Sequence, residues 1–369
     1  MKRLIICADG TWNIRDQVDK ATGKRHATNV TKLARAIKPT DDAGIDQVVF
    51  YHDGVGTRKG LDKLTGGAFG DGIEANIREI YRFIVYNYSP GDELFLFGFS
   101  RGAFSVRTLA GFMNRVGLIT KGDDYCVPDL YECYEKHFAP DSPQWAQAFK
   151  DVRAPRPCPP IKLIGVWDTV GALGAPGFIG QVFNRNRYRY HDVSLNAHIQ
   201  NAAHALAIDE RRSPFQPNIW SRPAHWPGSL IQAWFAGVHS NVGGGYVPDG
   251  LANEALHWMV EQAQAQGLAV DQAYLQPFLP CFNSVLQNSM TLMYRLLGSY
   301  IRPIGNHLAD GEVIHRSSLD RMDFAPCAYR PTNLTDYMHR TSAPHITDTT
   351  CVKRGVPCDP EAPHPPALH

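Results

Sequence analysis

A serine with a glycine two residues away on each side stands at Ser100, in the G-x-S-x-G pattern of residues 98–102. The apolar run 94–97 before it predicts a buried strand, and the amphipathic run 103–115 after it predicts a helix. On such a turn the glycines remove side chains that would clash, so the hydroxyl is exposed at the end of the strand. This context favours a nucleophilic serine over a glycine-rich packing turn.

A serine nucleophile needs a base that removes its proton and a carboxylate that orients the base. Asp168 follows the apolar run 161–167, and His239 follows the run 234–238. The carboxyl ends of parallel strands meet at one edge of a sheet, so these side chains can converge there. Taken singly, Asp168 could equally be a turn acid and His239 a core histidine. Their order and placement predict Ser100 as nucleophile, Asp168 as acid and His239 as base, with no metal and no cofactor.

Acyl transfer also needs backbone amides that bind the oxyanion. The amide of Arg101, directly after the nucleophile, is the first expected donor. The second is expected from Gly10 or Thr11, in the loop after the first apolar run of the chain, although this loop could also be a plain turn.

Further polar residues are expected to shape the site. Asp9 precedes Gly10, while His204 and Asp209 lie in one later segment, where we expect His204 to be a buried, hydrogen-bonded residue of a helix over 198–208.

Cys7 stands where an aspartate-nucleophile phosphatase would carry its attacking aspartate, and this disfavours phosphatase chemistry.

Short apolar runs alternate with helical stripes, which predicts an α/β fold with a mostly parallel sheet and helices on both faces. The expected strands are Leu4–Cys7, Gln47–His52, Glu93–Phe99, Ile161–Trp167 and Ile231–Gly237, the last of the sheet, and the expected helices include 73–84, 103–115, 198–208 and 253–266. Helical character is also expected over 270–297, followed by loop-like sequence. We expect one α/β-hydrolase-like domain over residues 1–350, with inserted cap or loop segments at about 121–160 and 174–230, and a Pro/His-rich tail over 351–369.

Composition narrows the classes of function. Hydrophobic residues make up 44% of the chain and the formal net charge is +1, so a globular core is expected and a nucleic-acid partner is not. The opening apolar run is too short for a signal peptide and no run has the length of a transmembrane helix, which makes a cytoplasmic location the default expectation. The 8 cysteines form no C-x-x-C pair. They fit a reducing compartment better than a disulfide framework, with a bridge between Cys351 and Cys358 left open.

Taken together, the motifs resemble a known family. The segments 9–13, 54–57, 96–103, 165–171, 204–211 and 234–240 occur in this order. They resemble the DUF2235 family of α/β-hydrolase domains, whose best-understood members are phospholipase effectors of the Tle1 type delivered by type VI secretion. The resemblance covers residues from about 3 to 246 and implies the same roles for Ser100, Asp168 and His239.

The resemblance also implies a lipid or acyl-ester substrate, transient contact with a membrane surface and export without a signal peptide. The expected function is therefore a serine hydrolase that cleaves carboxylic esters of phospholipids or other lipids through an acyl-enzyme. A soluble carboxylesterase acting on small acyl esters and a catalytically silent scaffold that binds lipid or protein remain open alternatives.

Overall fold

The described part of the chain forms one 8-stranded sheet in which all strand pairs are parallel. This structure, a computed structural model, describes residues 1–10, 13, 18, 23, 26–54, 66–170, 194–350 and 358, with 66–71 described by backbone alone. The strand order is β2-β1-β3-β4-β5-β6-β7-β8. The strands are β1 (Arg3–Ala8), β2 (Gln47–His52), β3 (Glu93–Phe99), β4 (Ile161–Trp167), β5 (Asn201–Ala207), β6 (Ser229–Phe235), β7 (Glu312–His315) and β8 (Ile346–Thr347).

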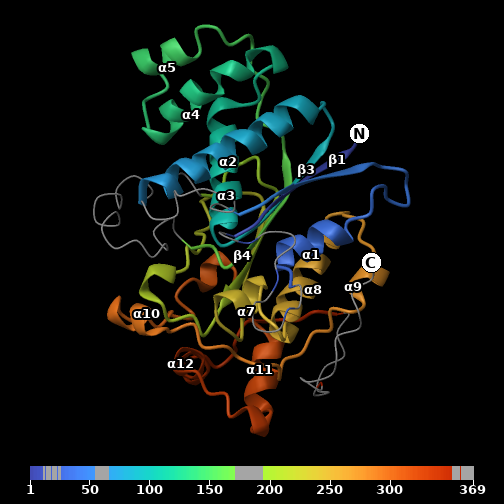
Figure 1. The fold of residues 1–369 in the computed structure, drawn as a ribbon, viewed down its shortest axis with the longest axis vertical. Helices are drawn as coiled ribbons and strands as arrows, with labels where there is room; N and C mark the ends of the chain where they lie inside the picture. The colour runs from blue at the N-terminus through green and yellow to red at the C-terminus, as the bar shows by residue number, and fades with distance from the viewer. Residues whose placement is uncertain are drawn as a thin grey trace.

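Helices cover both faces of the sheet (Figure 1). On one face lie α2 (Gly66–Asn87) and α3 (Arg101–Val116), and on the other lie α1 (Asn29–Ala36) and α8 (Gly250–Ala265). The predicted α/β fold, with a parallel sheet between two helical layers, is confirmed.

Strand β3 shows how the sequence builds both layers. Because successive side chains of a strand point to opposite faces, Leu94 and Leu96 enter the core under α2 and α3. Phe95, Phe97 and Phe99 enter the core under α1 and α8. A strand that is buried on both faces is therefore apolar almost throughout, as the sequence of β3 is.

The remaining elements decorate this framework. Between α3 and β4 the chain forms a helical excursion of η2 (Lys121–Cys126), α4 (Val127–Glu135) and α5 (Pro143–Ala148). The others are η3 (Ser213–Phe215), α7 (His239–Gly243), α9 (Gln272–Leu275), α10 (Leu292–Leu296), η4 (Leu308–Asp310), α11 (Arg316–Asp323), η5 (Ala325–Cys327) and α12 (Thr332–Arg340). Among the described residues, no helix combines the length and apolar character needed to cross a bilayer.

The order in which the chain adds strands to the sheet reverses beside β1. From β1 the chain crosses one face through α1 to reach β2, and from β3 it crosses the opposite face through α3 to reach β4. The loops after β1 and β3 therefore leave the sheet on opposite sides at the carboxyl ends of these two neighbouring strands, the place where open α/β sheets commonly bind ligands. Gly10 and Ser100 lie in those loops.

The expected helix over 198–208 is wrong. This segment forms strand β5, which is hydrogen-bonded between β4 and β6 inside the sheet. Alanine-rich sequence favours a helix locally, but pairing on both sides supplies the backbone bonds here. The segment 174–230 is consequently not an insertion throughout, since it contains a strand of the sheet; its residues 174–193 lie outside the described residues.

The expectations for the C-terminal third are also wrong in part. Only α9 and α10 occur within 270–297, where a longer helical region was expected. Beyond it, β7 and β8 extend the sheet past β6, where loop-like sequence and no further strand were expected. The strands β7 and β8 are short, and this explains why their apolar pattern is weak.

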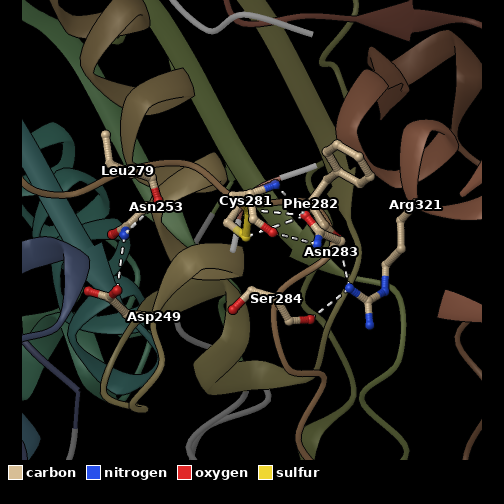
Figure 2. The surroundings of a disulfide bond; sticks show 9 residues. Asp249, Asn253, Leu279, Cys281, Phe282, Asn283, Ser284 and Arg321 are labelled. Carbon is tan, nitrogen blue, oxygen red and sulfur yellow. Dashed lines mark hydrogen bonds between the residues drawn. A yellow bond between two sulfur atoms is a disulfide. The ribbon is translucent and has the colours of Figure 1, made fainter. Parts of the chain in front are cut away.

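One disulfide closes a long loop. Cys281 is bonded to Cys358 with their Cα atoms 5.8 Å apart, so the open alternative of a bridge between Cys351 and Cys358 is not the one formed (Figure 2). Asn283 holds the same backbone, because its side chain donates to the Cys358 carbonyl and accepts from the Cys358 amide. The rest of the expected tail, 351–357 and 359–369, lies outside the described residues.

The tight approach of α3 to β1 gives a stability test. A methyl group at Gly102 would overlap the carbonyl of Ala8, which is main chain and cannot rotate away. We expect Gly102→Ala to lower the free energy of unfolding by about 2 kcal/mol or more, because α3 must shift off the strand. Urea unfolding measures this, with Gly122→Ala as control because the nearest atoms to its methyl group would be 3.9 Å away. Equal midpoints for the two variants would contradict the packing described.

Candidate active site

Ser100 occupies a strained turn between β3 and α3. Its backbone has φ 57° and ψ −118°, a region that residues with a side chain rarely adopt. The Ser100 amide donates to the carbonyl of Trp167 at 3.0 Å, and this bond ties the turn to β4. A methyl group at Gly98 would lie 2.6 Å from the amide nitrogen of Ala103, so the turn has no room for a side chain at that position. The glycines of the motif therefore serve the close packing of this turn.

Asp168 follows β4 and is fully buried. Its Oδ2 accepts a hydrogen bond from Nδ1 of His239 at 2.6 Å, and its Oδ1 accepts from the Ala207 amide at 3.0 Å. Arg302 donates to both oxygens, from Nη1 to Oδ1 at 2.6 Å and from Nη2 to Oδ2 at 3.0 Å. The structure thus brings Asp168 and His239 into direct contact.

His239 begins α7, and its ring is enclosed by aromatic side chains. The ring of Phe99 lies 4.7 Å from the imidazole, and the ring of Phe215 meets it edge-on at 5.0 Å. Because Nδ1 is bonded to Asp168, Nε2 is the nitrogen that remains to accept a proton.

Ser100 is adjacent in sequence to the ring that packs on His239. Phe99 precedes Ser100, so the imidazole and the serine turn share this contact. Among the described residues, Ser100 and His239 make no direct hydrogen bond, and this bond commonly tightens only with substrate bound. The structure therefore joins Asp168 to His239 by a hydrogen bond, and the ring that packs on His239 belongs to the residue before Ser100.

The electrostatics favour an ionised acid beside a neutral base. Burial acts to raise the pKa of Asp168, but the charge of Arg302 and the hydrogen bond from His239 outweigh it and hold this pKa well below its usual range. Burial lowers the pKa of His239 and outweighs the opposing effect of Asp168. The imidazole is consequently in its basic, neutral form at neutral pH.

The amides expected at the oxyanion position have different surroundings. Arg101 is the first residue of α3, and the opening amides of a helix lack acceptors within the helix. The side chain of Arg101 is a separate feature: burial lowers the pKa of its guanidinium to about 9. Gly10 lies against the serine, since a methyl group there would be 3.3 Å from Cβ of Ser100. The Gly10 amide donates to Oδ1 of Asp9 at 2.7 Å and is engaged in this structure. Thr11 lies outside the described residues.

Asp9 anchors the loop that carries Gly10. Its Oδ2 accepts from the hydroxyls of Thr28 at 2.5 Å, Thr31 at 3.0 Å and Tyr51 at 2.7 Å. Burial nevertheless raises the pKa of Asp9, and this outweighs the hydrogen bonds that lower it. These bonds fix the loop to α1 and β2, so Asp9 holds in place the loop that carries Gly10.

His204 lies on β5, not on the expected helix, and it is fully buried. Its Nε2 accepts from the amide of Thr169 at 3.1 Å, and its ring meets Trp220 edge-on at 5.4 Å. Burial, with the nearby charge of Arg107, lowers the pKa of His204 to about 3. His204 therefore stays neutral and holds the backbone directly after Asp168.

Asp209 and Glu210 support the turn before α7. Oδ2 of Asp209 accepts from the Gly237 amide at 2.7 Å and from the Tyr329 hydroxyl at 2.8 Å. Oε2 of Glu210 accepts from the His239 amide at 3.2 Å. Asp209 was expected near the site, whereas Glu210 was missed although it lies in the same motif.

Arg302 was also missed, because its segment showed only loop-like sequence and its partner Asp168 is 134 residues away. Among the described residues, no cluster of His, Cys, Asp and Glu is arranged to hold a metal ion.

Comparison with known proteins identifies the family. Residues 2–262 match the family described as T6SS, Phospholipase effector Tle1-like, catalytic domain. The chain belongs to this family. The membership predicted from the ordered motifs is therefore confirmed, and the match ends within α8, so that β7, β8 and Arg302 of this Tle1-like chain lie beyond it.

Individual relatives cover the Tle1-like chain only in part. An uncharacterized protein of Saccharomyces cerevisiae is 29% identical over 237 residues, which are 58% of this chain and 32% of that protein. A crystal structure of an uncharacterized protein from Pseudomonas aeruginosa gives a TM-score of 0.49 at 16% identity, covering 76% of this chain and 49% of that one. The structure of the Tle1 effector bound to the VgrG spike of the type VI secretion system gives a TM-score of 0.38 at 21% identity, covering 66% of this chain and 51% of that one. The chain thus spans about a third of the curated relative and about half of these solved chains.

The buried, neutral His204 makes the stability of this Tle1-like domain depend on pH. Its pKa is about 3 in the folded state and about 6.5 in an unfolded chain, so the unfolded state binds the extra proton between these values. Stability is thus lost as the pH falls through this window. The side-chain oxygen of Gln can still accept from the Thr169 amide. We expect His204→Gln to reduce the slope of the free energy of unfolding against pH by up to about 1.4 kcal/mol per pH unit.

Urea unfolding at several pH values between 4 and 7 measures these slopes. His345→Gln is the control, because His345 is exposed and its variant should keep the wild-type slope. An unchanged slope in His204→Gln would contradict the assigned environment.

Proposed function

We propose that this Tle1-like domain is a serine esterase that hydrolyses carboxylic esters of phospholipids or other lipids. Ser100 is the nucleophile, His239 the base and Asp168 the residue that orients the base. The observation that carries this proposal is the buried hydrogen bond of 2.6 Å between Asp168 and His239, beside the strained turn of Ser100. Family membership supports the lipid substrate.

In the first half of the reaction, Nε2 of His239 takes the hydroxyl proton of Ser100. The serine oxygen attacks the ester carbonyl carbon and forms a tetrahedral intermediate. The Arg101 amide, together with an amide of the loop after β1, stabilises the negative oxygen. Collapse of this intermediate breaks the bond to the alcohol, which leaves as lysophospholipid or simple alcohol after receiving the proton from His239.

In the second half, His239 takes a proton from water, and the resulting hydroxide attacks the acyl-serine. The acyl–oxygen bond then breaks, the proton returns to Ser100 and the fatty acid is released. Asp168 stabilises the charged imidazole in both halves, since its buried carboxylate stays ionised. The proposed steps require these side chains, the oxyanion amides and one water molecule.

Exposed apolar side chains of α10, beside the site, are suited to contact with a lipid surface. Tyr294 of α10 meets the ring of Phe215 edge-on at 6.0 Å, and Phe215 in turn contacts His239. On the same short helix, the side chains of Leu292 and Leu296 are 76% and 82% exposed. Such side chains can enter a bilayer surface and bring the site to its substrate. Delivery by type VI secretion, the route in the family's description, is part of the proposal.

Removal of the nucleophile tests the mechanism. We expect Ser100→Ala to lower kcat for p-nitrophenyl ester hydrolysis by about 10⁴-fold or more, because no other group can form the acyl-enzyme. Ser89→Ala, at an exposed turn before β3, serves as control and should keep wild-type activity. Thermal unfolding of both variants checks that the fold is intact. Full activity of Ser100→Ala would refute the mechanism.

Product analysis tests the substrate class. We expect vesicles of mixed phospholipids to yield fatty acid and lysophospholipid, identified by mass spectrometry, with a higher kcat/KM than short p-nitrophenyl esters. Turnover of small esters alone would assign a carboxylesterase instead. Absence of turnover on both substrates would favour a silent binding scaffold.

A further inference from the structure

Arg302 donates to both carboxylate oxygens of Asp168, including Oδ2, which also accepts from His239. Its side chain is fully buried, and the residue lies between α10 and β7 in the sequence. Besides its two bonds to the carboxylate, Nη1 donates to the Ala207 carbonyl at 2.8 Å and Nη2 donates to the Phe215 carbonyl at 2.6 Å. One guanidinium therefore joins the ends of β4 and β5 and the helical turn η3.

These bonds constrain two of the groups that contact the His239 ring, Asp168 and Phe215. The parallel bonds of the guanidinium fork fix the plane of the carboxylate, so Oδ2 of Asp168 faces Nδ1 of His239. The bond to the Phe215 carbonyl fixes the backbone that carries the aromatic ring packed on the imidazole. A lysine could supply the charge, but it could not supply this planar geometry.

We propose that Arg302 is a positioning residue of the reaction, which locks Asp168 in the orientation that directs His239 towards Ser100. This inference rests on the proposed function. It assigns a part of the site to a segment beyond the family match at residues 2–262, so the catalytic machinery of this chain is completed from its C-terminal third.

The charge of Arg302 has a measurable consequence. Arg302 competes with the imidazolium for the negative charge of Asp168, so its removal should raise the pKa of His239. The other charged or titratable groups around these side chains stay in place in such a variant. They are Glu210 and Arg212 near His239, His204 near Asp168, Arg107 near His204, and Tyr246 and Tyr294 near Arg212.

The test compares Arg302→Gln and Arg302→Lys with a matched control. For Arg302→Gln we expect kcat to fall about 10²-fold, with KM nearly unchanged. The acid limb of the pH profile of kcat/KM should move up by roughly 0.5 to 1 unit, since the base is charged at higher pH. For Arg302→Lys we expect a lower kcat with the acid limb in place, because the charge is kept and the fork is lost.

Arg321 provides the control, since it is a buried arginine of the same C-terminal third. Its Nη1 donates to the carbonyls of Phe282 and Ser284, as Figure 2 shows. Arg321→Gln should leave the acid limb in place and change kcat far less than Arg302→Gln does. Thermal unfolding reports the folded fraction of each variant. If Arg302→Gln does not fold, Arg302→Lys carries the test. A wild-type kcat in Arg302→Lys, or an unmoved acid limb in a folded Arg302→Gln, overturns the proposal.

A second readout requires no turnover. In a Ser100→Ala background, ¹⁵N NMR titration of the His239 imidazole should show a higher pKa once Arg302 is replaced by Gln. If the wild-type chain hydrolyses no ester, the proposed function fails while this titration still decides whether Arg302 acts on His239. If the wild-type chain is active and the titration is unmoved, the Arg302 proposal alone fails.

Discussion

The site depends on the hydrogen bonds and the ion pair that the buried carboxylate of Asp168 makes with its neighbours. A carboxylate without exposure to water is strongly disfavoured unless partners compensate for its lost hydration. Here Arg302, His239 and the Ala207 amide supply those partners. Because a buried ion pair of this kind adds little net stability, we attribute its presence to orientation: it specifies where the imidazole and the ends of two strands lie relative to one another.

The sheet supplies the positions that this interaction needs. Ser100, Asp168 and His239 follow β3, β4 and β6, so all of them leave the sheet at its carboxyl edge. The direction of growth reverses between β1 and β3, and this brings the loop with Gly10 beside the serine turn. The strain at Ser100 is sustained by dense packing around it, including the contact of α3 with β1. Topology and close packing thus place these side chains, while hydrogen bonds adjust their orientation.

Sequence patterns predict the parts of this arrangement that are locally encoded. The bulky apolar runs of β3 and β4 could be recognised as buried strands, and the polar residue after each could be named as a site candidate. Strand β5 could not, because its alanines favour a helix locally and only pairing with β4 and β6 determines its form. Arg302 gave no signal either, since its role arises from a contact across 134 residues of sequence.

Reaction with a fluorophosphonate, followed by peptide mass spectrometry, decides whether Ser100 is an activated nucleophile, because only a serine activated by a base forms the adduct quickly. We expect one adduct per chain, located on Ser100, that forms much more slowly in a folded His239→Gln variant. An adduct on another residue, or an equal labelling rate in that variant, would contradict it.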